Sequence, residues 1–315
     1  MSASEISVLE RRAYTQFCGE LFNRTFTYPL PPVLWHYTNG TSLISILESG
    51  RLFATQLACL NDQTEYRYSV NLYRQAMLAL WPSAKSTETE HLFGLIDEHL
   101  SPERYATSRN EWFVTCFSEM RDDLSQWRAY GGGENGYAIG FDTMALAQGI
   151  LAHSSWMVPV RYDKAANESL VANIAQATIR HFHEGFARRP GADPKDWALT
   201  FLIAWTKEIG YFAPFLKDPA FAAEKEWRIA HELNSGDILN MKYLQRTALM
   251  SRHIPLPYPP PTEPNSKLLP IKEILVGPGR HQTVSRISVG DLLLTCGYPK
   301  DAIPVTLSSI PFQGV

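Results

Sequence analysis

The pattern of apolar and polar positions predicts short strands separated by helices. A first strand is expected at 34–37, where an aromatic and aliphatic run follows two prolines. A helix starting at Thr41 should follow, because three apolar residues recur at helical spacing before Gly50. Later strands are predicted at 52–54, 112–118, 137–142, 157–162, the Glu226-Trp227-Arg228 segment, 271–276 and 303–307.

Longer amphipathic stretches predict helices at 65–81, 88–100, 167–186 and 196–216, with a short one over 124–128. Short strands with helices gathered between them are typical of an α+β fold with an antiparallel or mixed sheet. We expect an N-terminal helical extension over 1–33 and a single domain over 34–315. An all-helical insertion at 164–220 and a Pro-rich loop at 255–270 should interrupt that domain.

Composition narrows the classes of function. The 315 residues are 45% hydrophobic, and the formal net charge of -3 provides no strong field for a nucleic acid. The four cysteines form no C-x-x-C pair and the N-terminus does not resemble a signal peptide, so we expect reduced thiols and a cytoplasmic location. The most apolar helical stretch, at 197–205, is far shorter than the roughly 20 residues of a membrane span. We therefore expect no membrane association.

Two carboxylates stand two residues apart where a loop leads into a predicted strand. If this segment is extended, Glu224 and Glu226 point to one face, because side chains alternate with period two. One carboxylate could then stabilise a developing cation while the other orients an attacking group. A solvated strand edge is the alternative interpretation of this pair.

Several common active-site signatures are missing or out of context. Gly131, Gly133 and Gly136 match the spacing of a dinucleotide-binding loop, but a helix is predicted before them and a strand after them, which is the reverse of what that loop requires. These glycines more simply end a helix and let the backbone turn or approach a ligand. His181 and His183 lie on different sides of a predicted helix, so we expect no metal site. The chain has neither a Gly-x-Ser-x-Gly elbow nor a P-loop.

Polar and aromatic residues near the glycine run are further candidates. Ser118 ends a predicted strand, where a hydroxyl usually satisfies backbone groups. Trp127, Tyr130 and Tyr137 flank the glycines, and such aromatics either pack in the core or form a stacking platform for a planar base.

Five segments together resemble a bacterial and phage-encoded family known only as domain of unknown function 2971. They cover roughly 34–276, in the order Leu34-Trp35-His36-Tyr37-Thr38, Leu60-Asn61-Asp62-x-x-Glu65, Cys116-Phe117-Ser118-Glu119, Trp127-Arg128-x-Tyr130 through Asp142, and Glu224-x-Glu226-Trp227-Arg228-Ile229. The name of this family implies no function.

A more remote resemblance is to ADP-ribosyltransferases. The His36-Tyr37-Thr38 strand and the capped helix after it are similar to the opening of the DNA-modifying toxin group and of the RNA 2′-phosphotransferases. The resemblance implies a split antiparallel or mixed sheet that holds NAD in a cleft. It also implies that the His36-Tyr37-Thr38 strand contacts NAD, with His36 on the adenosine ribose, and that Ser118 supports the nicotinamide side.

The same resemblance implies the remaining roles. Glu226 becomes the catalytic carboxylate, Glu224 positions an acceptor, and Tyr130 or Tyr137 stacks on the nicotinamide ring, with Trp127 as a further NAD-binding residue. The chain departs from the group in having no Ser-Thr-Ser triplet and in carrying long helices before Glu224.

The expected activity is therefore NAD-dependent ADP-ribosyl transfer with nicotinamide release, without a metal. Cleavage of the nicotinamide–ribose bond passes through an oxocarbenium-like state, which a fixed carboxylate stabilises. The sequence leaves the acceptor open between protein and nucleic acid, and a toxin or phage-defence role follows only from analogy. Two alternatives remain: a non-catalytic member that binds a nucleotide or a partner protein, and a nucleic-acid-processing enzyme that uses a local arginine cluster.

Overall fold

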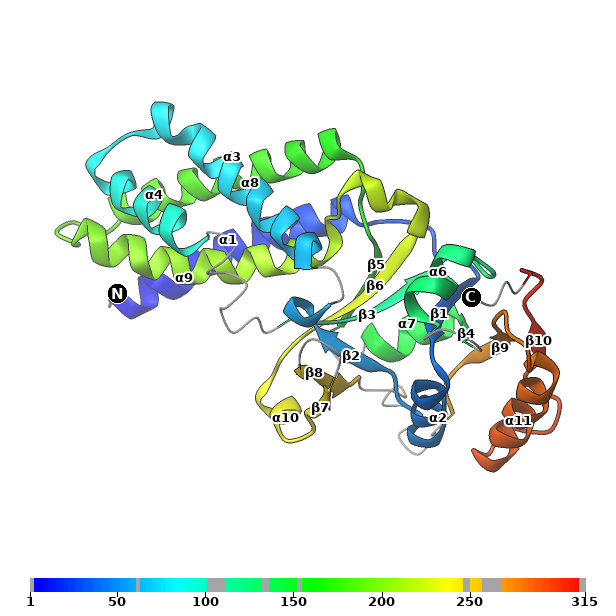
Figure 1. The fold of residues 1–315 in the computed structure, drawn as a ribbon. Helices are drawn as coiled ribbons and strands as arrows, with labels where there is room; N and C mark the ends of the chain where they lie inside the picture. Colours follow the sequence, from blue (N-terminus) through cyan, green and yellow to red (C-terminus); the bar gives the residue numbers. More distant parts are fainter. Residues whose placement is uncertain are drawn as a thin grey trace. The chain divides into compact units, whose positions relative to one another are not determined.

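The computed structural model describes residues 3–60, 63–100, 112–131, 136–151, 155–245, 250–256 and 268–311. The chain divides into two compact units (Figure 1). We call them the helical unit, with Met1–Thr27, Leu60–Asn110 and Val160–Phe221, and the sheet unit, with Tyr28–Cys59, Glu111–Pro159 and Ala222–Val315.

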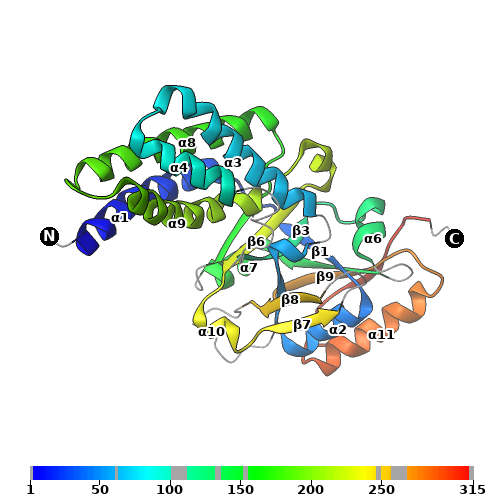
Figure 2. The ribbon, with the colours of Figure 1, turned by 60° about the vertical axis from the view of Figure 1, so that its left-hand side comes forward.

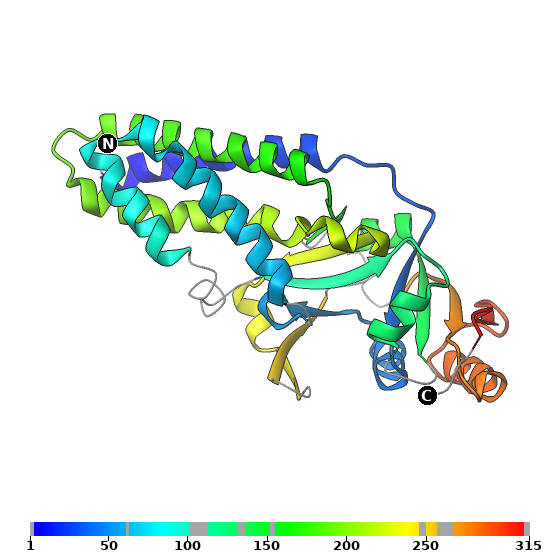
Figure 3. The same cartoon turned by 45° about the horizontal axis from the view of Figure 1, so that its top comes forward.

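The helical unit is built from three separate stretches of chain. Its helices are α1 (Ala3–Thr25), α3 (Gln63–Ala84), α4 (Thr87–His99), α8 (Lys164–Ala187), α9 (Pro194–Phe212) and the short 3-10 helix η2 (Ala213–Phe215). Long helices of this unit run alongside one another, with α3 against α8 and α4 against α9 (Figure 3). The Asp193 side chain caps α9 and Pro194 occupies its first turn, where a missing N–H costs nothing.

Among the described residues, the sheet unit contains a ten-stranded mixed sheet. Its strands are β1 (Val33–Thr38), β2 (Phe53–Gln56), β3 (Trp112–Ser118), β4 (Tyr137–Asp142), β5 (Ser155–Pro159), β6 (Glu226–Glu232), β7 (Lys242–Gln245), β8 (Met250–Pro255), β9 (Ile271–Val276) and β10 (Val305–Leu307). The main order is β10-β9-β4-β1-β3-β2-β8-β7, while β6 pairs with β3 and β5 pairs with β6. The pairs are antiparallel except for β9 with β10.

Helices of the sheet unit connect and cover these strands. They are α2 (Gly40–Ser49), α6 (Leu124–Tyr130), α7 (Thr143–Leu151), α10 (Ser235–Ile238) and α11 (Gln282–Thr295), with the 3-10 helix η1 (Leu57–Cys59). A further 3-10 helix, η3 (Pro219–Glu224), leads from the helical unit into β6. In Figure 2, α2 and α11 lie side by side.

Both faces of the sheet around β1 are apolar. The face that we call the Leu34 face carries Leu34, Phe117, Phe141 and Trp227 in one buried cluster. The face that we call the Trp35 face carries Trp35 and Tyr37, which pack with Trp127 of α6 in a second cluster. The period-two alternation of β1 thus divides it between two cores.

The α+β prediction and the mixed sheet are confirmed. The helical part is larger than the expected insertion at 164–220, because 1–27 and 60–110 join the same unit. The β7–β8 hairpin and α11 were not predicted from the sequence. Of the Pro-rich loop at 255–270, residues 257–267 lie outside the described residues. Among the described helices, none has the length and apolar character that crossing a membrane requires.

Candidate functional site

The sheet opens between β1 and β3. β1 pairs with β4 along its whole length, from Val33 opposite Asp142 to Thr38 opposite Tyr137. With β3, the described part of β1 has a single register pair, Trp35 opposite Ser118. We call the opening beyond this pair the β1–β3 split.

His36 lies at the β1–β3 split, where its side chain forms a hydrogen bond to β3 in place of a backbone ladder bond. Its Nδ1 is 2.9 Å from the carbonyl oxygen of Cys116, and its ring contacts Phe117 with centroids 5.6 Å apart. Burial lowers the pKa of His36, although the hydrogen bond to Cys116 opposes this shift. The imidazole is therefore neutral near pH 7. Because a carbonyl only accepts, Nδ1 carries the proton and Nε2 carries the lone pair.

The Ser118 hydroxyl hydrogen-bonds to backbone groups. Its Oγ donates to the carbonyl oxygen of Glu224 at 2.7 Å and accepts from the Met120 N–H at 3.1 Å. The side chain is only 2% exposed. Ser118 thus fixes the end of β3 to the chain before β6, which is the ordinary role of a hydroxyl at a strand end.

The predicted same-face pair of carboxylates does not form. Glu224 is the last residue of η3, and β6 begins at Glu226. Between them, Lys225 has a φ of 43°, a left-handed conformation that breaks the period-two alternation of an extended chain. The prediction that Glu224 and Glu226 share a face of one strand is therefore wrong. Trp227 is buried on the Leu34 face, as strand alternation after Glu226 requires.

Glu226 is held in a buried ion pair. Arg228 Nε lies 2.7 Å from one carboxylate oxygen and its NH2 group 2.9 Å from the other. Both side chains are nearly inaccessible, at 5% exposed for Glu226 and 2% for Arg228. The two residues are neighbours on one face of β6, because side chains two apart in a strand share a face. The Glu-x-Arg spacing could have predicted this pair, but the sequence interpretation considered only the two glutamates.

The three residues expected to meet in one cleft do not share a face. Register pairs run from Trp35 to Ser118 and from Ser118 to Glu226, so these side chains lie on the Trp35 face. His36 follows Trp35 and lies on the Leu34 face. The prediction that His36, Ser118 and Glu226 line one cleft is wrong, because Trp35 is the β1 residue aligned with Ser118.

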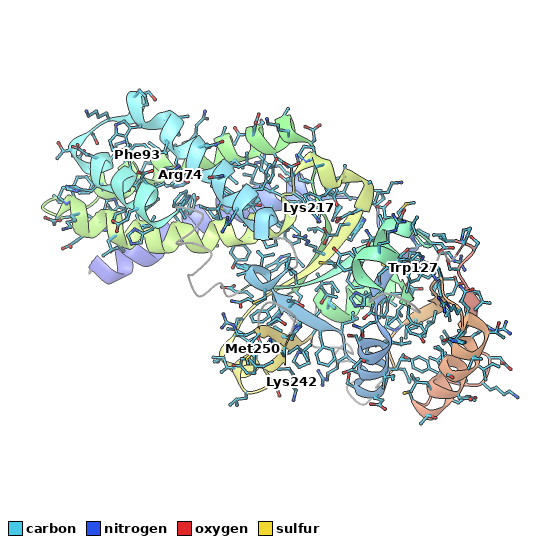
Figure 4. The ribbon with its side chains drawn as sticks, in the orientation of Figure 1. Arg74, Phe93, Trp127, Lys217, Lys242 and Met250 are labelled. Carbon is cyan, nitrogen blue, oxygen red and sulfur yellow. The ribbon has the colours of Figure 1, made fainter. Side chains whose placement is uncertain are left out.

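Two predicted contact residues instead hold the loop after β3. Tyr37 donates to the carbonyl oxygen of Met120 at 2.7 Å and accepts from the Asp123 N–H at 3.1 Å. Trp127, labelled in Figure 4, donates from Nε1 to Asp122 at 2.8 Å. Its ring meets the Tyr37 ring edge-on, with centroids 4.7 Å apart. Both aromatic rings are buried, and burial raises the pKa of Tyr37.

The two candidate tyrosines lie on opposite faces. Tyr130 packs against the Trp35 cluster, whereas Tyr137 packs against the Leu34 cluster and is partly buried. Because Tyr137 is opposite Thr38 and Ile139 is opposite His36, Tyr137 shares its face with His36 and with Thr38, which is itself buried. The Cα atoms of His36 and Tyr137 are diagonal neighbours, about 7–8 Å apart by strand geometry.

The glycine run closes on itself between α6 and β4. A Cβ on Gly136 would lie 2.5 Å from the Gly131 Cα, so the backbone requires glycine for this close approach. The helix before Gly131 and the strand after Gly136 confirm that this is no dinucleotide-binding loop of the Rossmann type. Within the described residues, no group of three His, Cys, Asp or Glu side chains could hold a metal ion.

Part of the chain matches a known protein family. Residues 126–229 match the model of a family described as Protein of unknown function (DUF2971). The DUF2971 segment begins in α6 and ends in β6, so it contains Trp127, Tyr130, Tyr137 and the Glu226–Arg228 pair but not His36 or Ser118. No curated protein and no solved structure matches the chain.

Proposed function

We propose that the sheet unit binds a nucleotide, NAD, at the β1–β3 split. The opening of the ladder beyond Trp35 and Ser118 carries this proposal. A short ladder at this place supports the proposal, because a split sheet at the His36-Tyr37-Thr38 strand is what the resemblance implies. NAD is the ligand that this resemblance implies.

The groups on the Leu34 face of the split suit a nucleoside. The neutral His36 imidazole has its Nδ1 proton committed to Cys116, so Nε2 is oriented to accept a hydrogen bond from a ribose hydroxyl. Tyr137 stands on the same face of the neighbouring strand, where its partly buried ring would stack on a base. A polar acceptor beside an aromatic ring is a common combination in ligand sites.

The buried ion pair of Glu226 favours NAD binding over cleavage of the nicotinamide–ribose bond as the function. Stabilising an oxocarbenium-like centre requires a carboxylate that faces the developing charge. Glu226 is engaged by Arg228, and it lies on the face opposite His36. Transfer of ADP-ribose to a protein or nucleic acid therefore remains a prediction that needs its own test.

The two tyrosines give a matched test of binding. We expect Tyr137→Ala to weaken NAD affinity, measured by titration calorimetry, by about 1–3 kcal/mol, the range for loss of base stacking. Tyr130→Ala removes a similar ring from the opposite face and should leave affinity unchanged. His36→Ala should also weaken binding. Equal affinity of wild type and Tyr137→Ala, with both folded by thermal melts, would contradict the proposed position of the ligand.

Nicotinamide release separates a binding module from an enzyme. Wild-type protein incubated with NAD labelled in the nicotinamide and adenine moieties should retain intact NAD. If nicotinamide is released, and Glu226→Gln abolishes this release while remaining folded, the protein is an ADP-ribosyltransferase or NAD glycohydrolase. Labelled macromolecules recovered from that incubation would then identify the acceptor class.

A further inference from the structure

A serine, a histidine and an aspartate form a continuous hydrogen-bonded chain at the far end of β5 and β6. Ser155 Oγ lies 2.8 Å from His231 Nδ1, and His231 Nε2 lies 2.9 Å from an oxygen of Asp237. Ser155 and His231 are directly opposite each other in the register of the two strands. This is the set of contacts by which a base activates a hydroxyl nucleophile while a third group orients the base.

The partners determine the tautomer of His231. A carboxylate only accepts hydrogen bonds, so Nε2 carries the proton and donates it to Asp237. In the neutral imidazole, Nδ1 then carries the lone pair and accepts from the Ser155 hydroxyl. The imidazole is thereby in the form that can remove the serine proton.

Asp237 is held in place by the turn before α10. The same carboxylate oxygen accepts from the Asn234 N–H at 2.9 Å, and the Asn234 side chain accepts from the N–H groups of Gly236 and Asp237. This reciprocal cap fixes the carboxylate beside His231 without using a long flexible side chain.

The backbone at Ser155 supplies a hydrogen-bond donor. The Glu119 N–H donates to the Lys225 carbonyl, so Lys225 belongs to a hydrogen-bonded pair with the β3 side. Backbone hydrogen bonds alternate along an antiparallel strand, so the odd-numbered residues of β6 bond to β3 and the even-numbered ones bond to β5. The Ser155 N–H, opposite odd-numbered His231, therefore points away from β6. In the described part of the chain, β5 has no second neighbouring strand on that side. An outward N–H on the nucleophile residue can donate to an oxyanion.

We propose that Ser155, His231 and Asp237 form a nucleophilic centre for small acyl esters, with Ser155 and His231 as catalytic residues and Asp237 as the positioning residue. Ser155 Oγ attacks the ester carbonyl carbon while its proton passes to His231 Nδ1. The C–O bond to the leaving group breaks, and that oxygen takes the proton from Nδ1. Water then hydrolyses the acyl-serine by the same route and releases the carboxylic acid. Ser155 and His231 are 2% and 3% exposed, so the reaction requires an ester small enough to reach a buried hydroxyl.

The chain contains a matched control for this centre. Ser251 Oγ lies 2.7 Å from His253 Nε2, and Thr55 Oγ1 lies 3.0 Å from His253 Nδ1. Here both imidazole nitrogens meet hydroxyls, so Thr55 occupies the position at His253 that Asp237 holds at His231. The nucleophile proposal predicts that Ser155 reacts and Ser251 does not. It stands independently of NAD binding at the β1–β3 split.

The test uses the full-length folded protein and diisopropyl fluorophosphate, a small reagent for activated serines. We expect one adduct by intact mass, located on Ser155 by peptide mapping, and no adduct on Ser251 or after heat denaturation. p-Nitrophenyl acetate should acylate the wild type at least ~100-fold faster than Ser155→Ala or His231→Gln, the lower range for loss of a general base. Asp237→Glu should retain more of this rate than Asp237→Asn, because it keeps a carboxylate.

Labelling of the wild type is the decisive measurement, since it needs no variant to fold. An unlabelled wild type, or labelling at other serines only, overturns the proposal and leaves a buried polar network. In that case, Ser155→Ala would lower the melting temperature and change no reactivity. Equal reactivity of Asp237→Asn and Asp237→Glu would remove Asp237 from the centre.

Discussion

At the scale of single residues, the Glu226–Arg228 pair determines what β6 contributes. Both side chains are nearly fully buried, and the guanidinium contacts both carboxylate oxygens. Such a pair adds little net stability compared with apolar residues, but removing one partner leaves a buried charge. Glu226 thus stabilises the fold whether or not it takes part in a reaction.

The first prediction follows from that burial. Glu226→Gln should lower the free energy of unfolding by about 3–5 kcal/mol, because Arg228 loses its counter-charge inside the protein. Urea denaturation followed by fluorescence measures this loss. Lys272→Gln is the control, because its ion pair with Asp142 is half exposed and should contribute at most about 1 kcal/mol. Similar effects of the two substitutions would contradict the proposed role of the buried pair.

Residue orientation was predictable where strand alternation holds. The predicted Glu226-Trp227-Arg228 strand requires by alternation that Trp227 point away from Glu226, and Trp227 is buried in the core on the opposite face. The orientation of Glu224 could not be predicted, since it depends on the left-handed conformation of Lys225, a residue type that rarely adopts it. The prediction that His36 lies beside Ser118 was wrong for a similar reason. Inter-strand register depends on tertiary packing, which the sequence of one strand does not encode.

At the scale of elements, the loop between β3 and α6 is fixed from both sides. Tyr37 of β1 binds its backbone at Met120 and Asp123. Asp122 binds the segment after β10 by accepting from Ser308 Oγ, Ser309 N–H and Ser309 Oγ, in addition to Trp127. The loop therefore connects β1, α6 and the segment after β10 by hydrogen bonds, and these bonds stabilise the backbone beside the β1–β3 split.

The second prediction tests the tyrosine anchor. Tyr37→Phe keeps the ring contact with Trp127 but removes the hydroxyl, which leaves a backbone carbonyl and an N–H without their partner. The expected loss in unfolding free energy is about 1–3 kcal/mol. Hydrogen exchange should show faster exchange at 120–123, whereas the helical unit should be unaffected. Unchanged exchange in the loop would mean that Tyr37 acts through packing alone.

The third prediction concerns acid. Burial alone would raise the pKa of Asp122, but hydrogen bonds from Ser308, Trp127 and Ser309 outweigh it and lower the pKa. A lowered folded pKa stabilises the protein above the unfolded value of about 4, and this stabilisation is lost as pH falls through the folded pKa. The Tm difference between wild type and Asp122→Asn should therefore shrink from pH 5 to pH 2. A constant difference would show that ionisation of Asp122 is not involved.

Elements with strong apolar runs were predicted from the sequence, and weak ones were not. β3 and β4 have the predicted bounds because each is a nearly continuous apolar run, and β9 because four of its six residues are apolar and three of these are consecutive. β7 was missed because all four of its residues are exposed, which gives no apolar alternation to detect. Lys242 and Met250, which Figure 4 labels on this hairpin, show its exposed character. The Ser155–His231–Asp237 chain had no sequence signal, because its members are far apart and follow no motif.

At the scale of the whole molecule, each unit has its own core although neither is continuous in sequence. Phe182 is fully buried in the helical unit, where its ring meets Phe201 edge-on at 5.3 Å. Phe141 is fully buried in the sheet unit, where its ring meets Phe117 edge-on at 5.9 Å. Separate cores of this kind are expected to unfold as separate cooperative units.

The last prediction uses one substitution in each core. Phe182→Ala and Phe141→Ala should each destabilise their own unit by about 3–5 kcal/mol, through lost burial and the cavity left behind. Hydrogen exchange with mass spectrometry across a urea series reports the opening of each unit separately. Phe182→Ala should lower the midpoint for helices α8 and α9 and leave the midpoint for β4 and β9 in place, while Phe141→Ala should do the reverse. If either variant shifts both midpoints equally, the chain unfolds as one cooperative body, and the two cores depend on each other for stability.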